Sequence, residues 1–342
     1  ISSLYKNDGL NFSDAVRAAL QEVVGAYGIV VISKDDPDTI VAARYGSPLV
    51  LGVGEGEYFI ASDASPIIEH TRNVIFLEEG EMVTISPEGH EIKKIHENKV
   101  ISKAVTQLDM TVEQIEKGNF PHFMLKEIHD QHHTIMDTMR GRLLLDEGTA
   151  HLGGIRDCMD RIQDASRFYI TACGTSWHAG LIGKYLIEEY ANIPVHVEYA
   201  SEFRYRKSII DNKTVLIAIS QSGETADTLA AIKKAKENGA LALGICNVVG
   251  SSIARLTDYG IYTHAGPEIG VASTKAFTAQ VTVLNMLALL LGRLKGLSKI
   301  HGRKIAESLA SLDTVVKTIL EDTSQIEEVA WKTEKADNFL YL

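Results

Sequence analysis

The sequence has few cysteines and carries no surplus of positive charge. Its 342 residues include three cysteines, Cys158, Cys173 and Cys246, with no C-x-x-C spacing. We therefore expect neither a disulfide framework nor a zinc or other metal site, which fits a reducing, cytoplasmic environment. The formal net charge of −11 leaves no basic stripe for the phosphates of a nucleic acid or for an anionic membrane surface. Nucleic acid and membrane are therefore not expected as partners.

Long hydrophobic runs and nucleotide-binding motifs are also missing. The longest apolar stretch, residues 281–291, is interrupted by Thr282 and Asn285 and is too short to span a bilayer, so it predicts a buried helix. No G-x-x-x-x-G-K-S/T loop occurs. Ser222 lacks the preceding glycine of a G-x-S-x-G nucleophile elbow, because position 220 is serine. These absences argue against a nucleoside-triphosphate loop and a hydrolase elbow, and no cofactor is expected.

The composition is that of a globular protein, and the chain is longer than one typical domain. Hydrophobic residues make up 45% of the chain and charged residues 23%, so the chain should fold. A length of 342 residues suggests two or more cores. The chain opens on Ile1 without a secretory signal, and residues 337–342 resemble the first strand of a further unit. We expect the sequence to be a fragment of a longer protein.

The first 147 residues divide into a strand-rich part and a helical connector. Residues 13–24 have the apolar spacing of an amphipathic helix, with Ser13 as its N-cap. Short apolar or β-branched runs then predict strands at 27–32, 39–43, 58–61 and 82–85. Between residues 96 and 147 the charge density rises and the pattern becomes helical, notably at 123–130.

Alternating strands and helices form the clearest architectural signal. Strands are expected at 168–172, 195–199, 214–220 and 241–246, and helices at 176–190 and 224–238. This alternation predicts an α/β fold with a parallel sheet, right-handed crossovers and a ligand at the carboxyl ends of the strands. Further helical patterns follow at about 272–294, 303–322 and 324–336.

Two of these strands run into hydroxyl-rich turns just before a helix. The turns are Cys173-Gly-Thr-Ser176 and Ser220-Gln-Ser-Gly-Glu-Thr225. Hydroxyl groups and the free N–H groups of a helix N-terminus together suit a phosphate, and Gly174 and Gly223 let the backbone come close. The alternative is that Ser176, Ser222 and Glu224 are simple helix caps. Two such turns in one sheet favour a binding site.

These turns belong to longer motifs that resemble a known family. The motifs are ACGTS at 172–176, ASEFRYRK at 200–207, SQSGETADTL at 220–229 and GVASTKAF at 270–277, the last again with hydroxyls at a helix start. In this order they resemble the first sugar-isomerase (SIS) domain of the glutamine–fructose-6-phosphate aminotransferases. The segments GAYG at 25–28, ARYGSPL at 43–49, FIASD at 59–63 and FLEEG at 76–80 are similar to the later part of that family's glutaminase domain. With MLKEI at 124–128 and MRGR at 139–142 in the connector, the resemblance covers nearly the whole chain.

The resemblance implies a parallel-sheet SIS domain with helices on both faces, preceded by a strand-rich, partial N-terminal-nucleophile glutaminase domain. The expected boundaries are 1–95 for the glutaminase part, 96–147 for the inter-domain connector, 148–300 for the first SIS domain, 301–336 for a helical connector and 337–342 for the start of a second SIS domain. The complete enzyme would make glucosamine 6-phosphate and glutamate from fructose 6-phosphate and glutamine for the hexosamine pathway. The resemblance also implies a homodimer.

The resemblance assigns the substrate site as well. Fructose 6-phosphate or glucosamine 6-phosphate would be held through its phosphate and neighbouring oxygens by Thr175, Ser176, Ser220, Gln221, Ser222 and Thr225, in turns that also contain Cys173 and Gly174. Val271 and Ser273 would line the sugar. No catalytic residue is expected in this chain. The family's glutaminase nucleophile is an N-terminal cysteine followed by Gly-Ile, whereas position 1 here is isoleucine. The isomerase Glu, His and Lys belong to a second SIS domain, which this chain only begins at Phe339, so the chain alone is predicted to be inactive.

A different class of function uses the same domain. A non-catalytic sugar-phosphate sensor that regulates a partner would need a basic helix-turn-helix near one end, whereas residues 1–95 are strand-rich and not basic. Within the connector, Asp130-Gln-His132 stands where the family usually has Glu-Gln-Pro, which leaves the local helix start open.

Four other features have a functional and a plain interpretation. Cys173 is interpreted as a packing residue rather than a nucleophile, because no base lies beside it in the sequence. Lys275 is interpreted as a surface or substrate-edge charge rather than a Schiff-base amine. Residues 52–56 are expected to form a hairpin turn rather than a nucleotide loop. His129, His132, His133 and Asp137 are expected to be solvated rather than metal ligands.

Overall fold

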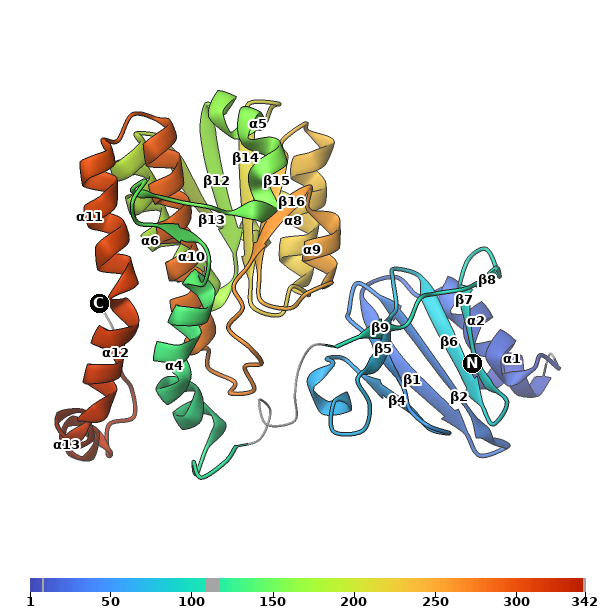
Figure 1. Ribbon diagram of the computed structural model, residues 1–342. Coiled ribbons are helices and arrows are strands. Elements are labelled where there is room, and N and C mark those ends of the chain that lie inside the picture. The colour runs from blue at the N-terminus through green and yellow to red at the C-terminus, as the bar shows by residue number, and fades with distance from the viewer. Residues whose placement is uncertain (8, 109–116, 341–342) are drawn as a thin grey trace. The chain divides into compact units, whose positions relative to one another are not determined.

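The computed structural model describes residues 1–7, 9–108 and 117–340. The chain divides into two compact units, Ile1–Glu116 and Lys117–Leu342 (Figure 1). The domain boundaries expected from the sequence are finer than this division and stay predictions. Each unit is described by itself below.

The first unit is built from two antiparallel sheets and two helices. One sheet has the order β1 (Tyr27–Ser33), β2 (Asp36–Tyr45), β6 (Glu81–Ser86), β7 (Gly89–Lys94), β8 (Val100–Ile101). The other has the order β4 (Tyr58–Ala61), β3 (Val50–Val53), β5 (Asn73–Phe76), β9 (Thr106–Gln107). The helices are α1 (Ser2–Asn7) and α2 (Phe12–Gln21), and a short 3-10 helix spans Ser65–Ile67.

The first sheet is covered on both faces, which explains the continuous apolar run in β2. Val41 and Ala43 pack against α2, whereas Ala42 packs toward the second sheet, and all three are fully buried. Successive side chains of a strand point to opposite faces, so a stretch of strand that is covered on both faces favours apolar residues at successive positions. The predicted hairpin at 52–56 is confirmed, because β3 and β4 pair antiparallel with Val53 opposite Tyr58.

The start of α2 differs from the expectation. Asn11, and not Ser13, is the N-cap, and its side chain accepts a 2.8 Å hydrogen bond from the Asp14 N–H. Ser13 Oγ instead lies 2.6 Å from Thr84 Oγ1 on β6. The helix also ends earlier than expected, at Gln21, because the apolar pattern continues into residues that no layer covers, such as Val24, which is 99% exposed.

The second unit contains a parallel sheet with the order β13-β12-β14-β15-β16. The strands are β12 (Arg167–Ala172), β13 (Val195–Tyr199), β14 (Thr214–Ser220), β15 (Leu241–Cys246) and β16 (Tyr259–Tyr262). The helices are α4 (Phe123–Met139), α5 (Met159–Asp164), α6 (Gly174–Ala191), α7 (Ala200–Tyr205), α8 (Ala226–Glu237), α9 (Ser252–Leu256), α10 (Lys275–Leu294), α11 (Lys299–Ala310), α12 (Leu312–Glu321) and α13 (Ser324–Thr333). A short hairpin, β10 (Leu143–Leu144) and β11 (Thr149–Ala150), and a 3-10 helix, Gly153–Cys158, complete the unit.

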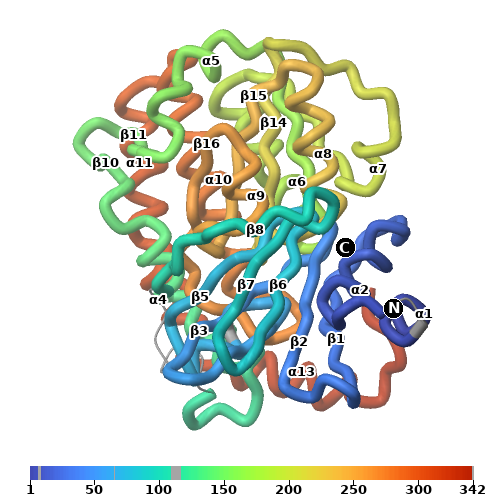
Figure 2. Tube along the Cα trace, turned by 90° about the vertical axis from the view of Figure 1, so that its right-hand side faces the viewer, coloured from blue at the N-terminus to red at the C-terminus, as the bar shows by residue number. Residues whose placement is uncertain are grey.

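Helices cover both faces of this sheet, as the sequence predicted. On one face Phe168, Ile170 and Ile217 pack against α6, α10, α4 and α5. On the other face Tyr169 and Leu216 pack against α7, α8 and α9, and α7 lies beside α8 (Figure 2). All seven residues of β14 are buried, which is why its sequence is an unbroken run without alternation.

The long apolar helix α10 is the centre of the helical layer. It runs from Lys275 to Leu294 and is therefore longer than the apolar stretch at 281–291. By length and composition alone the whole helix could cross a membrane. In this unit, however, it packs against α6, α4 and α11, and 61% of its most apolar window is buried. The predicted buried helix is confirmed, and α10 is a core helix here.

Some boundaries depended on contacts that the local pattern does not reveal. The short elements α7, α9 and β16 were not predicted. The helical pattern at 303–322 forms two helices, α11 and α12, which meet at Ser311. Residues 337–340 lie in no helix or strand, and residues 341–342 lie outside the described residues, so the strand expected at 337–342 is not formed in its described part.

Candidate functional site

The two hydroxyl-rich turns lie at the same edge of the sheet because β12 and β14 are parallel neighbours. Thr171 is paired with Ala218, so both strands end beside one another. From there the chain turns to opposite sides: β12 leads through α6 to β13, and β14 leads through α8 to β15. This is the point where the strand order reverses, and open α/β sheets bind ligands in the crevice that such a reversal creates.

The residue at the N-cap of α6 does not cap this helix with its side chain. Cys173 is in the N-cap position with extended backbone, and its side chain caps no N–H group. Gly174 follows with a φ of +56°, in the left-handed region that favours glycine. Gly174 and Thr175 are exposed to solvent. The first N–H groups of α6 are therefore available to an anion.

Ser176 is not a helix cap. It lies in the first turn of α6, is 7% exposed, and its Oγ accepts a 3.0 Å hydrogen bond from the side-chain amide of Gln280 on α10. Because this bond occupies one lone pair of the hydroxyl oxygen, the Ser176 O–H remains free to donate to another group. The sequence motif pointed to Ser176 but not to Gln280, because the two residues are far apart in the chain.

The second turn is held by its own hydroxyl groups. Ser220 Oγ accepts a 2.9 Å hydrogen bond from the Gly223 N–H and lies 3.1 Å from Thr225 Oγ1. Ser222 Oγ accepts a 3.2 Å bond from the Glu224 N–H. The Gln221 carbonyl oxygen accepts a 3.3 Å bond from a backbone N–H of the loop after β15. The N-cap residue of α8 is Thr225, whose side chain makes no capping hydrogen bond, and Ser222 bonds an N–H group that precedes the helix, so the simple-cap interpretation is wrong for Ser222 here.

Glu224 does cap a helix, but a different one from that expected. Its Oε1 accepts a 2.8 Å hydrogen bond from the Ser252 N–H at the start of α9, and the Gly223 carbonyl accepts a 2.8 Å bond from Ile253. Gly223 has a φ of +69°, and a Cβ atom at this position would lie 2.0 Å from Ser251 Oγ. The turn therefore packs directly on the start of α9 and requires glycine at this position.

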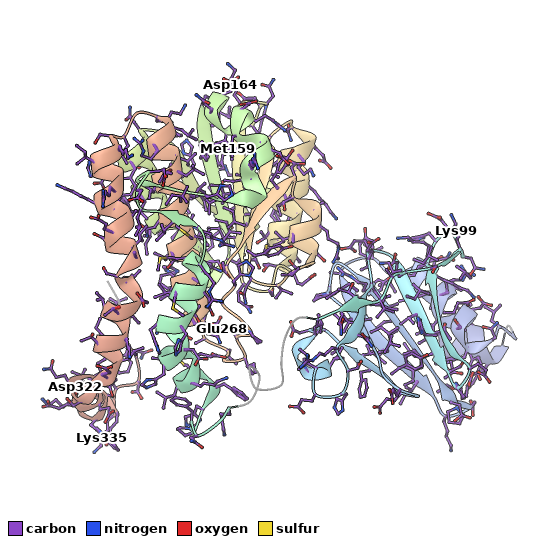
Figure 3. The ribbon with its side chains drawn as sticks, in the orientation of Figure 1. Lys99, Met159, Asp164, Glu268, Asp322 and Lys335 are labelled. Atoms are coloured by element: carbon purple, nitrogen blue, oxygen red, sulfur yellow. The ribbon has the colours of Figure 1, made fainter. Side chains whose placement is uncertain are left out.

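The third predicted segment lies in the loop between β16 and α10. Val271 is fully exposed and Ser273 is half-buried. The sequence predicted hydroxyls at the helix start, but the cap of α10 is the carboxylate of Glu268, labelled in Figure 3. Its Oε1 accepts hydrogen bonds from the N–H groups of Thr274 (2.8 Å) and Ala276 (3.0 Å).

The base of this loop is fixed by Asn247, which follows β15. Its Oδ1 accepts 2.8 Å hydrogen bonds from the Thr263 hydroxyl and the Ala265 N–H, and its Nδ2 donates a 2.6 Å bond to the Gly266 carbonyl. Neither Asn247 nor Glu268 was singled out from the sequence. Both residues follow a strand of the sheet: Asn247 comes directly after β15, and Glu268 lies in the loop after β16. This position after a strand is a local signal that could have found them.

The environment of Cys173 favours a packing role. The side chain packs against the α8 face of the sheet. Burial raises the pKa of the thiol, and the negative charge of Asp227 raises it further, while hydrogen bonds with Thr228 and with the backbone of Ala200 oppose this only in part. A thiol with a raised pKa is largely protonated at neutral pH and is a poor nucleophile.

Two other expectations concern residues near α4. Lys275 is not at the surface: it is 4% exposed, and its Nζ lies 3.3 Å from Asp130 Oδ2, because the start of α10 packs on α4. His132 Nδ1 lies 2.8 Å from the His129 carbonyl oxygen. Within the described ranges, no group of three or more His, Cys, Asp or Glu side chains is arranged to hold a metal ion.

Comparison with known proteins bears on the same segment. Residues 161–290 match the family model of the SIS domain. The glutamine–fructose-6-phosphate aminotransferase (isomerizing) of Chlorobaculum tepidum is 57% identical over 343 residues, which cover 100% of this chain and 56% of the relative. That of Bacteroides thetaiotaomicron is 52% identical over 330 residues, which cover 96% of this chain and 54% of the relative. Among solved structures, the C-terminal domain of glucosamine-fructose-6-phosphate aminotransferase from Francisella tularensis has a TM-score of 0.61 at 36% identity, covering 64% of this chain and 62% of that one.

The parallel sheet, its two turns and the matching family model define residues 161–290 as a SIS domain. Over its whole length the chain is similar to glutamine–fructose-6-phosphate aminotransferases, as its motifs predicted. It spans a little more than half the length of the curated relatives it matches.

Proposed function

We propose that this chain is part of a glutamine–fructose-6-phosphate aminotransferase and binds fructose 6-phosphate where β12 and β14 end. The observation that carries the proposal is the pair of hydroxyl-rich turns on neighbouring parallel strands, each followed by a helix whose N-cap side chain makes no capping hydrogen bond. Names of the relatives favour this enzyme over a non-catalytic sensor, because the matches at 57% and 52% identity are aminotransferases.

The phosphate would be held by neutral donors and helix N-termini rather than by cations. The hydroxyls of Ser222 and Ser176 each accept a hydrogen bond from a protein N–H group, so each O–H proton can be donated to a phosphate oxygen. The N-termini of α6 and α8 add the positive ends of two helix dipoles. This suits a protein of formal net charge −11, which offers an anion no general attraction.

The remaining proposed contacts divide by position. Thr175, Ser220, Gln221 and Thr225 complete the two turns around the phosphate and the adjacent sugar oxygens, while Val271 and Ser273 line the sugar from the loop before α10. Cys173 and Gly174 shape the first turn. In the complete enzyme this site would present the open-chain sugar for isomerisation and for amination by ammonia released from glutamine, giving glucosamine 6-phosphate and glutamate. The groups that move protons are proposed to lie in a second SIS domain.

The proposal is tested by thermal-shift titration of the 342-residue chain. At a ligand concentration of about 100 times the dissociation constant, binding stabilises the folded state by about 2.7 kcal/mol, which should raise the melting temperature by several degrees. Fructose 6-phosphate should produce this shift, and fructose without phosphate should produce far less. Equal shifts for the two sugars would contradict the phosphate site.

A parallel assay separates binding from catalysis. The chain should release neither glutamate from glutamine nor glucosamine 6-phosphate from the two substrates, because the proposed site contains binding groups and no acid or base. Protein-dependent glutamate release would contradict this prediction. We also propose that the enzyme is cytoplasmic and that it forms a homodimer. Sedimentation equilibrium of the purified chain would test the dimer.

A further inference from the structure

The loop that carries Val271 and Ser273 is held by a buried carboxylate on α4. Glu127 is 2% exposed, and its Oε1 accepts hydrogen bonds from the N–H groups of Ile269 (2.5 Å) and Gly270 (3.0 Å). Its Oε2 lies 3.2 Å from the same Gly270 nitrogen. The loop passes beside α4 in Figure 1. One side chain thus restrains two successive residues immediately before Val271.

The next acidic residue on the same face of α4 holds the other end of the segment. Asp130 is one helical turn after Glu127, and its Oδ2 lies 3.3 Å from Nζ of the buried Lys275. The loop tip between these two attachments includes Val271, which is fully exposed. Residues 269–275 are therefore fixed at both ends by α4, while the tip stays free to meet a ligand.

A buried carboxylate is costly unless it is well paired, so its presence needs a reason. Glu127 does not cap α4, because it lies inside that helix and its acceptors are used by the loop. The loop is adapted to this contact as well: a Cβ atom on Gly270 would lie 2.5 Å from Glu127 Oε2. Glycine at position 270 thus allows the backbone N–H to reach the carboxylate.

We propose that Glu127 is a positioning residue for sugar recognition: it fixes the loop at Ile269 and Gly270 so that Val271 and Ser273 meet the sugar. This inference rests on the proposed function, and it adds a residue outside the SIS motifs to the site. The inference distinguishes the contacts to the sugar from the contacts to the phosphate. The phosphate turns after β12 and β14 do not contact Glu127, so loss of its carboxylate should impair sugar contacts and leave phosphate contacts intact.

The test compares two ligands on the whole chain by NMR titration. For Glu127→Gln, which keeps the size of the side chain, the dissociation constant of fructose 6-phosphate should rise about tenfold, as expected for weakening charge-assisted hydrogen bonds. The dissociation constant of inorganic phosphate should stay within about twofold of the wild-type value. Asp137→Asn is the control matched for charge, since Asp137 lies on the same helix, is paired with Arg140 and does not hold the loop.

Two further measurements keep the result interpretable. Gly270→Ala disturbs the same contact from the loop side and should reproduce the selective loss. Amide hydrogen exchange should rise at residues 269–275 in Glu127→Gln and not in Asp137→Asn. Equal weakening of both ligands, or unchanged fructose 6-phosphate binding in Glu127→Gln, would overturn the inference while leaving the proposed function standing. Failure of the wild-type chain to bind fructose 6-phosphate would overturn the proposed function and this inference with it.

Discussion

The side-chain amide of Gln280 donates a 3.0 Å hydrogen bond to Ser176 Oγ, which connects the central helix α10 to the first turn of α6. Both residues are buried. The bond sets the orientation of the serine hydroxyl, since an oxygen that accepts from one side can direct its own proton to the other. A residue of the helical layer thereby contacts the proposed phosphate site at the strand ends.

Substitution of Gln280 should change binding in a graded way. Gln280→Leu removes the bond and lets the Ser176 hydroxyl rotate, so the dissociation constant of fructose 6-phosphate should rise several-fold, by about 1 kcal/mol. Gln280→Glu should weaken binding more, because the carboxylate would accept the Ser176 proton and place a negative charge near the phosphate. Isothermal titration calorimetry measures both values. Wild-type affinity in Gln280→Glu would rule out this role.

Ser222→Ala should weaken sugar-phosphate binding by about tenfold. A charge-assisted hydrogen bond to phosphate contributes roughly 1.5–3 kcal/mol, and water replaces part of it in the variant. Ser311→Ala, at the junction of α11 and α12, is a suitable control because its Oγ bonds only the local Ser308 carbonyl. Unchanged affinity in Ser222→Ala would count against the turn at 220–225 as the phosphate site.

Cys173→Ser should bind fructose 6-phosphate within about twofold of the wild-type chain, since a packing residue that keeps its shape leaves the backbone in place. Burial raises the thiol pKa, so we also expect slow alkylation of Cys173 at pH 8 compared with a free thiol. Mass spectrometry after iodoacetamide treatment measures this. Loss of binding in a folded Cys173→Ser chain would assign the sulfur a direct role.

Gly223→Ala should destabilise the second unit more than Gly250→Ala. Both glycines have positive φ, +69° and +73°, so each substitution incurs backbone strain of about 1–2 kcal/mol. A Cβ at Gly223 also meets Ser251 Oγ at 2.0 Å, whereas nothing lies within 4 Å of a Cβ at Gly250. The free energy of unfolding, measured with urea, should therefore fall by about 1–3 kcal/mol more in Gly223→Ala than in Gly250→Ala. Equal losses of stability in the two variants would mean that Ser251 moves away from the added Cβ at little cost.

The first unit should lose stability in acid through Glu81. Burial acts to raise the pKa of this carboxyl, but hydrogen bonds from the Glu78 N–H, Lys103 and Lys94 outweigh it and hold the pKa below its ordinary value of 4.5. A group with a lowered folded-state pKa stabilises the protein above its unfolded-state pKa. That contribution is lost as the pH falls from about 4.5 through the lower, folded-state pKa.

Glu81→Gln should flatten this dependence. Amide hydrogen exchange of peptides from β2 and β6, followed between pH 6 and pH 3 after correction for intrinsic rates, should show falling protection in the wild-type chain and a weaker fall in the variant. Glu97→Gln, at an exposed position between β7 and β8, is the control at a nearby position. The same pH dependence in wild type and Glu81→Gln would exclude Glu81 as the source.

The sequence by itself was sufficient for the similarity to the aminotransferases, the α/β class, the strands from β12 to β15 and both hydroxyl-rich turns. These features are local, because a strand of consecutive apolar residues, a glycine and hydroxyls before a helix all lie within about a dozen neighbouring residues. The contacts between distant residues were decided by the packing of α10 on α4 and α6. Gln280 meets Ser176 and Glu127 meets Gly270 across 104 and 143 positions of the chain. Lys275, expected as a surface or substrate-edge charge, is buried against Asp130 for the same reason. No local pattern records which helix a side chain will face, so these contacts depended on the tertiary structure.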